Sequence, residues 1–201
     1  MRFPFFLPII LIFLGLLAYK RRQQTRRQMS ANEDFLEKER EANSTRRKDI
    51  SDLPYIRVAL EKLPIAKYKD TELEQEESVL FALSEERCIN LSDKTNTQLK
   101  LLYGPANLNE LSKYDENFAS LTKSLVQYAK RERELDHVEE ARQILEYGLT
   151  IHSDISDNYT MLSEIYTEMG HPEKIQDILA FVPTQNEAIY HLIQQKLTAY
   201  Q

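Results

Sequence analysis

The chain has 201 residues, of which 32 are acidic and 26 are basic, so its formal net charge is −6. Its four glycines lie far apart and form no glycine-rich loop of the kind that binds nucleotide phosphates. A single cysteine, Cys88, excludes an internal disulfide and a zinc site built from several cysteines. These counts exclude the common nucleotide-binding classes, and we expect no cofactor and no small-molecule substrate.

The first 19 residues differ from the rest, because 15 of them are apolar and Arg2 is their only charged residue. Residues 3–19 form an uncharged run of about 25 Å at ~1.5 Å per helical residue, close to the shortest length that spans a hydrocarbon core. Tyr19 stands at its end, where an interfacial aromatic residue is typical. The sequence therefore predicts a transmembrane anchor over residues 1–19.

A cluster of basic residues follows this apolar segment. It consists of Lys20, Arg21, Arg22, Arg26 and Arg27. A cleaved signal peptide carries its positive charge before the apolar run and ends in a small-residue cleavage site, so that alternative and a buried helix are less favoured. Basic flanks stay in the cytoplasm. We therefore expect a single-pass protein of the cell membrane, with the lipid bilayer as one partner, its N-terminus outside and its C-terminal domain cytoplasmic.

Residues 20–50 carry ten basic and six acidic side chains and few apolar ones, which predicts a charged juxtamembrane linker, in which residues 32–41 could form a short exposed helix. Its basic cluster either attracts anionic lipid or serves only as a topology signal. The remaining domain, residues 51–201, has 15 basic and 26 acidic residues. Because this domain would be repelled by phosphates, we expect no nucleic-acid partner.

The first half of this domain shows short elements. Residues 55–60 alternate apolar and polar side chains, which indicates an extended stretch. Thr71 and Glu74 have capping-box spacing and predict a helix start, so the glutamates that follow are explained by the positive helix end better than by metal binding. A short helix is predicted over residues 97–103, ended by Gly104.

The second half carries apolar residues three and four positions apart, which predicts four antiparallel helices, with Asp115 capping the first and Asn107 marking an earlier helix start. The inward-facing residues expected are Phe118, Leu121, Leu125, Tyr128, Val138, Ala141, Ile144, Leu145, Gly148, Ile155, Tyr159, Leu162, Tyr166, Met169, Ile175, Ile178 and Leu179.

The pattern repeats after 34 residues. This shift places Leu125 on Tyr159, Ile144 on Ile178 and His137 on His171, among other pairs. The second unit carries the motif Tyr159-x-x-Leu162-Ser163-x-x-Tyr166, then Met169-Gly170 and Ile175-x-x-x-Leu179. In period and motif the chain resembles the tetratricopeptide repeat family, whose unit is a helix–turn–helix.

The resemblance covers residues 121–182, with repeats over residues 121–154 and 155–183. It departs from the family at Glu132, where an aromatic residue is usual, and at two small-residue positions taken by Ile175 and Val182. Thr184-x-x-Glu187 predicts a capping helix over residues 185–200. The predicted fold is thus all-α: a short TPR-like solenoid of antiparallel helix pairs, preceded by the transmembrane helix and the linker.

The resemblance implies a groove, lined by the first helix of each unit, that binds a protein or peptide partner. The corresponding positions are Lys123, Val126, Lys130, Arg133, Thr160, Glu164 and Thr167. A solvated charged face is the alternative interpretation of these positions.

No catalytic group or metal site is predicted. The four histidines lack carboxylate, histidine or cysteine partners at helical ligand spacing, and Cys88 has only Arg87 as a basic neighbour. We therefore expect a membrane-anchored scaffold or adaptor for an unidentified protein partner, and not an enzyme. The alternative is a structural subunit of a larger membrane complex, assembled in part through the transmembrane helix, although the segment offers few small residues for a helix interface.

Overall fold

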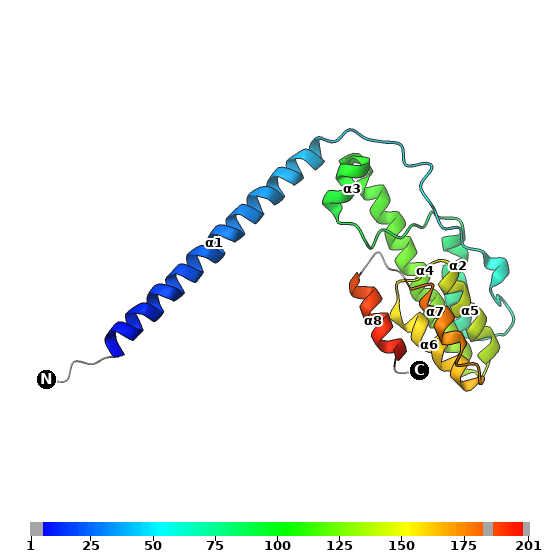
Figure 1. Ribbon diagram of the computed structural model, residues 1–201. Helices are drawn as coiled ribbons and strands as arrows, with labels where there is room; N and C mark the ends of the chain where they lie inside the picture. Colours follow the sequence, from blue (N-terminus) through cyan, green and yellow to red (C-terminus); the bar gives the residue numbers. More distant parts are fainter. Residues whose placement is uncertain (1–5, 183–186, 199–201) are drawn as a thin grey trace. The chain divides into compact units, whose positions relative to one another are not determined.

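The structure, a computed structural model, describes residues 6–182 and 187–198 (Figure 1). These residues form helices and turns, with no β-strand among them and one isolated antiparallel bridge between Ile56 and Cys88. The α-helices are α1 (Phe6–Ser44), α2 (Thr71–Ser84), α3 (Asn96–Tyr103), α4 (Leu108–Glu134), α5 (Val138–Thr150), α6 (Ser156–Glu168), α7 (Lys174–Leu179) and α8 (Glu187–Leu197). Two 3-10 turns are η1 (Leu60–Lys62) and η2 (Pro105–Asn107). The predicted all-α class is confirmed.

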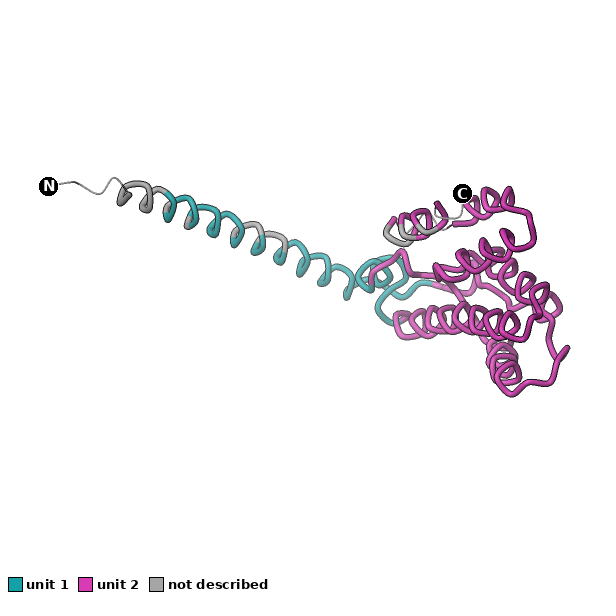
Figure 2. The backbone as a smooth tube through the Cα atoms, turned by 90° about the horizontal axis from the view of Figure 1, so that it is seen from below, with its two compact units in different colours: residues 1–48, 96–106 teal, residues 49–95, 107–201 magenta. Residues whose placement is uncertain are grey.

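The chain divides into two units (Figure 2). Unit 1 comprises residues 1–48 and 96–106, and unit 2 comprises residues 49–95 and 107–201. The charges are sorted between them: the sequence places 12 basic and 5 acidic residues in unit 1, against 14 basic and 27 acidic residues in unit 2. Their net charges are therefore +7 and −13, which sum to −6.

Unit 1 joins the end of α1 to α3. The Glu39 carboxylate accepts hydrogen bonds from the Lys100 ammonium, at 2.8 Å, and from the Thr97 hydroxyl. Gly104, at φ +87°, ends α3 beside the backbone of residue 46, where a Cβ atom would stand 2.8 Å from a carbonyl oxygen. Only glycine combines this left-handed backbone with so close an approach. The predicted stop of this short helix at Gly104 is confirmed.

Helix α1 is longer than the short helix expected over residues 32–41. It continues from Phe6 through the basic cluster to Ser44, so most of the predicted linker is helical. The physical reason is composition: between Gly15 and Pro54 there is no helix breaker, and Glu, Lys, Arg and Gln are good helix formers. Lys20, Arg21 and Arg22 are exposed side chains within this helix.

The membrane anchor predicted for residues 1–19 is also corrected. Across the described residues, no helix is both long enough and apolar enough to cross a bilayer. Residues 1–5 of the predicted anchor lie outside the described residues. The apolar residues occupy only the beginning of a helix of 39 residues that is charged over most of its length. The expected single-pass topology and the expected cell-membrane localisation are therefore corrected.

Unit 2 is a set of packed helices, in which α4 lies between α2 and α5, and α6 packs on α5, α7 and α8. The largest fully buried side chains come from α2, α4, α5 and α6. They include Leu73, Leu80, Phe118, Leu121, Leu125, Tyr128, Ile144, Leu145, Tyr159, Leu162 and Ile165. The apolar faces predicted for these helices from three- and four-residue spacing are confirmed, apart from Met169, which is exposed.

Helix starts differ in part from the sequence-based expectation. Helix α4 is continuous from Leu108 and does not begin at Asp115, whose carboxylate instead accepts the Leu91 N–H at 2.7 Å. The N-cap of α2 is Asp70, which accepts from two backbone N–H groups. The proposed capping motif at Thr184 lies outside the described residues, whereas α8 buries Ile193 and Leu197 in the core.

The turns that end α4 and α6 are equivalent after the 34-residue shift. The His137 N–H donates to the Glu132 carbonyl at 2.8 Å, and the His171 N–H donates to the Tyr166 carbonyl at 2.8 Å. The preceding residue is left-handed in both turns, with φ values of 65° at Asp136 and 77° at Gly170. Both turns are Schellman motifs, which need a left-handed residue after the helix. Turn chemistry therefore explains part of the observed repeat.

Gly170→Ala is expected to destabilise unit 2 by about 1–2 kcal/mol, because a Cβ atom is unfavourable in a left-handed residue. Among the described residues, no heavy atom lies within 4 Å of the position that this Cβ would take. The loss of stability therefore comes from the backbone conformation and not from a steric clash. The equivalent Asp136→Gly change is expected to stabilise by up to about 1 kcal/mol. Urea denaturation of both variants checks this pair, and a neutral Gly170→Ala would contradict it.

Candidate functional site

The residues of the predicted partner groove are dispersed between surface and core. On α4, Lys123 and Lys130 are exposed, whereas Val126 is only 5% exposed and belongs to the core. On α6, the Thr160 and Thr167 hydroxyls donate to carbonyls one turn earlier in their own helix. The two threonines are therefore engaged within α6, and Val126 has no surface to offer a partner.

Arg133 links the two helices that carry the predicted groove. Its guanidinium contacts the Glu164 carboxylate at 2.5 Å and also the carboxylate of Glu168. The structure thus brings one basic residue of α4 and one acidic residue of α6 together as an ion pair. Two predicted groove residues of opposite charge therefore neutralise each other here.

The basic residues of α4 differ in whether they are paired. Arg131 contacts the Asp70 carboxylate at 2.7 Å, and Lys113 contacts Glu86 at 2.9 Å. Within the described part of the chain, Lys123 and Lys130 make no ion pair and no side-chain hydrogen bond. They stand two turns apart on one helix, about 10.5 Å at 1.5 Å per residue. We call them the lysine row.

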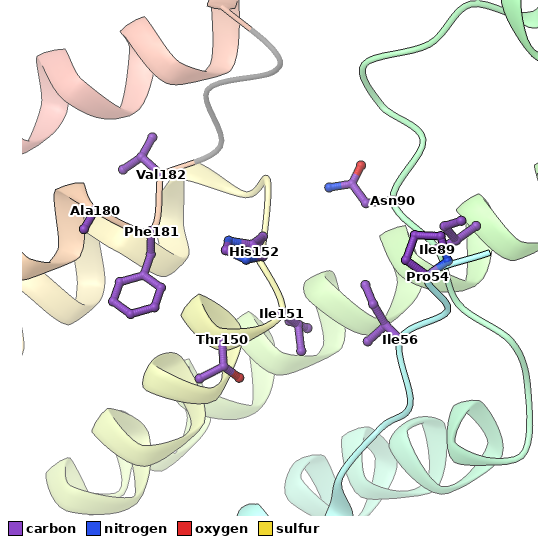
Figure 3. A pocket seen from close by; sticks show the side chains of 10 residues that line it. All are labelled: Pro54, Ile56, Ile89, Asn90, Thr150, Ile151, His152, Ala180, Phe181 and Val182. Atoms are coloured by element: carbon purple, nitrogen blue, oxygen red, sulfur yellow. The ribbon is translucent and has the colours of Figure 1, made fainter. Parts of the chain in front are cut away.

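A cavity of about 510 Å³ opens in unit 2 between the end of α5, the end of α7 and the chain on either side of the Ile56–Cys88 bridge (Figure 3). Most of its lining side chains are apolar, and Asn90, Thr150 and His152 are the polar ones. His152 itself adopts a left-handed backbone, with φ 54°, in the turn that ends α5. The position of His152 beside the cavity is therefore a consequence of the turn that ends α5.

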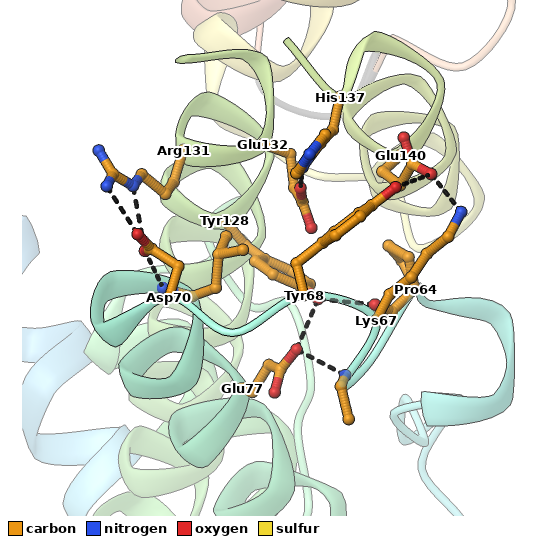
Figure 4. Close-up of polar contacts among 12 residues, drawn as sticks. Pro64, Lys67, Tyr68, Asp70, Glu77, Tyr128, Arg131, Glu132, His137 and Glu140 are labelled. Atoms are coloured by element: carbon orange, nitrogen blue, oxygen red, sulfur yellow. Dashed lines mark hydrogen bonds and ion pairs between the residues drawn. The ribbon is translucent and has the colours of Figure 1, made fainter. Parts of the chain in front are cut away.

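A second concentration of polar side chains surrounds residues 64–70, which we call the strap (Figure 4). The Tyr128 hydroxyl contacts the Pro64 carbonyl at 3.0 Å and the Glu77 carboxylate at 2.8 Å. The Ala66 N–H donates to the same Glu77 carboxylate at 2.7 Å. These contacts hold the first part of the strap against α2 and α4.

The rest of the strap is held by carboxylates and by one aromatic contact. Lys67 forms an ion pair with Glu140 of α5, and the Tyr68 hydroxyl donates to the same carboxylate at 3.2 Å. At the end of the strap, the Arg131 guanidinium keeps the pKa of Asp70 at about 2. That contribution to stability is complete above the usual carboxyl pKa and is lost as pH falls towards 2.

Beneath the strap lies what we call the buried pair: Glu132, which is buried, and His137, whose side chain is 25% exposed. The Glu132 side chain is 1% exposed, and its Oε2 atom stands 2.7 Å from Nδ1 of His137. Its other oxygen, Oε1, is buried and has no hydrogen-bond partner among the described residues. The His137 ring is stacked on the Tyr68 ring, with centroids 3.6 Å apart and planes inclined by 17°. Burial raises the pKa of Glu132, and the contact with His137 opposes that rise.

The remaining residues singled out in the sequence carry no comparable arrangement. Cys88 is fully buried, and burial raises the pKa of its thiol to about 11, so the reactive thiolate is scarce at neutral pH. Within the described residues, no group of three or more His, Cys, Asp or Glu side chains is arranged to hold a metal ion.

Comparison of the chain with protein-family models, with curated proteins and with solved structures yields no match. The expected membership of the tetratricopeptide repeat family is therefore corrected, because no model of that family matches. Two features give a physical reason. A buried glutamate, Glu132, replaces the aromatic residue that the family uses, and α7, which would complete the second helix pair, has only six residues.

The strap and its buried pair were missed by reasoning from sequence. In the sequence, Glu132 stands out only as a departure from the repeat pattern, and His137 only as the residue that the 34-residue shift places on His171. One signal was present: a glutamate within the buried stripe of α4 needs a polar partner, and a histidine five residues later, just beyond the helix end, can supply it. The strap residues carry no such signal, because their partners are distant in sequence.

Proposed function

We propose that unit 2 is a helical scaffold that binds an acidic segment of a partner protein along α4. The observation that carries this proposal is the lysine row. Lys123 and Lys130 are exposed and unpaired among the described residues, although they belong to a unit with 27 acidic side chains. The other basic residues of α4 form internal ion pairs, so these two remain for a partner.

The proposal is consistent with the surrounding structure. A fully packed core beneath α4 keeps the row rigid, because Leu121, Leu125 and Tyr128 are completely buried on the opposite side of the helix. Rigid positioning lowers the entropy cost of binding. Complementary charge steers association and selects a partner with acidic residues two helical turns apart. The proposal includes no catalysis, no cofactor and no nucleic acid.

Charge reversal tests this function. The double variant Lys123→Glu/Lys130→Glu is expected to reduce recovery of the partner in a quantitative affinity purification at least about tenfold, as expected when two favourable charge contacts become repulsive. Lys62→Glu/Lys69→Glu is a matched control, since both lysines are exposed in the same unit and the change in net charge is identical. If the two double variants recover every protein equally, the row does not bind a partner.

A further inference from the structure

We propose that the strap is a proton-controlled latch: one proton shared between Glu132 and His137 keeps residues 64–70 closed over α4 and α5, and loss of this proton opens them. This regulatory device is independent of partner binding along α4. It rests on the contacts between the strap and the buried pair (Figure 4).

Three carboxylates converge beneath the strap from three helices. Glu77 of α2, Glu132 of α4 and Glu140 of α5 are 8%, 0% and 7% exposed. Glu77 accepts hydrogen bonds from the Tyr128 hydroxyl and the Ala66 N–H. Two of the three carboxylates thus bind the strap directly, through Ala66 and through Lys67 and Tyr68. The third, Glu132, contacts His137, and the His137 ring is stacked on the Tyr68 ring.

The positive groups that face this cluster are few. Lys67 of the strap contacts Glu140, and His137 at the start of α5 contacts Glu132. Arg131, although adjacent to Glu132 in sequence, pairs with Asp70, Glu72 and Glu134. The hydroxyls of Tyr68 and Tyr128 supply hydrogen bonds but no charge.

The charge balance shows what the proton does. With one proton on the Glu132–His137 pair, the pair is neutral, and the charges of Glu77, Glu140 and Lys67 sum to −1. Without that proton the sum is −2, and the added charge sits on a carboxylate whose Oε1 atom has no partner. A buried charge without compensation is strongly unfavourable, and neighbouring like charges add to the penalty. Admission of water relieves both.

The strap is the element whose movement admits water. It is not helical, and Ala66 within it has a left-handed backbone, with φ 56°. Its Lys67 side chain is 53% exposed, and most of its attachments are side-chain contacts. Segments with exposed contacts and little regular structure open before packed helices do. Lifting Tyr68 from the His137 ring therefore hydrates Glu132 without unfolding α4 or α5.

The direction of the pH dependence follows from the burial of Glu132. Burial raises the pKa of Glu132, so the folded state holds a proton on this carboxylate more tightly than the unfolded chain does. The stabilisation is complete at low pH and is lost as pH rises through the folded-state pKa. Glu140, whose pKa is lowered by Lys67, stays ionised over this pH range and keeps its contacts with Lys67 and Tyr68. The latch is thus closed at acidic pH and opens at higher pH.

Amide hydrogen exchange of the full chain tests the latch. After correction for intrinsic exchange rates, protection of the Ala66 amide is expected to fall at least about tenfold between about pH 5 and about pH 8. A factor of about ten is the effect of a difference of one pKa unit between the closed and open states. Glu132→Gln, which is neutral at every pH, should hold protection constant. Glu116→Gln is the matched control, since it removes an exposed carboxylate from the same helix and should retain the wild-type pH dependence.

A second variant covers the case in which Glu132→Gln does not fold. His137→Phe keeps an aromatic ring against Tyr68 but removes the contact that opposes the rise in the pKa of Glu132, so Glu132 should keep its proton, and Ala66 its protection, to higher pH than in the wild type. Wild-type protection that does not change with pH would overturn the latch. The same conclusion follows if Glu132→Gln retains the wild-type pH dependence.

Discussion

Gly148→Ala is expected to destabilise unit 2 by about 1–3 kcal/mol, the usual cost of overpacking a core. In an open helix interior the same change stabilises by roughly 0.5–1 kcal/mol. The difference arises where α5 meets α6: a Cβ atom on Gly148 would stand 2.1 Å from Oδ1 of Asn158. Asn158 is completely buried, and its amide donates to the Leu145 carbonyl at 3.0 Å, so it cannot turn away. Urea denaturation measures the change.

A double-mutant cycle separates this clash from other effects. Asn158→Ala alone removes a buried hydrogen bond and leaves space beside Gly148. In the double variant the new methyl group occupies that space, so the combined destabilisation should be smaller than the sum of the single changes by about 1 kcal/mol or more. Additive single changes would show that the close approach of α5 and α6 at this point does not limit stability.

Tyr128→Ala is expected to have the largest effect of any single truncation, about 3–5 kcal/mol, because it empties a fully buried aromatic site in α4. Tyr128→Phe keeps the ring and removes only the hydroxyl that contacts Glu77 and the Pro64 carbonyl. Removing this buried donor, while the Glu77 carboxylate keeps the Ala66 N–H, should cost about 1–3 kcal/mol.

Comparing the two variants by urea denaturation distinguishes core packing from strap attachment. The Phe variant should also lower protection of the Ala66 amide, because Ala66 and Tyr128 share the Glu77 carboxylate. A Phe variant as unstable as the Ala variant would mean that the hydroxyl contacts, and not the buried ring, dominate at this position.

Much of unit 2 could be predicted because its information is local. The spacing of Phe118, Leu121 and Leu125 marks the buried face of α4, and the structure buries all three. The 34-residue period also contains real structure, since Asp136 and Gly170 occupy equivalent left-handed turns. Yet the period did not establish a family. Turns and buried faces of this kind are shared by antiparallel helix pairs in general.

The N-terminal region shows where reasoning from amino-acid composition fails. Composition set residues 20–50 apart as a linker, but helix formation depends on backbone propensity, which charged residues such as Glu37 and Lys38 satisfy well. The apolar composition up to Tyr19 predicts a membrane anchor. The described part of α1, however, is not both long enough and apolar enough to cross a membrane. Composition alone therefore does not predict that α1 continues to Ser44.

The candidate site was the least predictable part. The contact between Lys67 and Glu140 joins residues 73 positions apart, and that between Tyr128 and Pro64 joins residues 64 positions apart. No periodicity encodes such pairs. The predicted groove residues were chosen by analogy with one helix of each repeat, so Val126 was included although the core buries it. Of that set, the lysine row is exposed and makes no ion pair or side-chain hydrogen bond with the described residues, and it is the part that the proposed function uses.

Site-specific photo-crosslinking tests the central proposal, binding of a protein partner along α4, most directly. A photoreactive residue at Gln127, between the two lysines, should give a crosslink to a partner protein that disappears in the Lys123→Glu/Lys130→Glu variant. The same probe at Gln176, an exposed position on α7, should give no such product. Crosslinking that is equal at the two positions, or that survives the charge reversal, would contradict binding along α4.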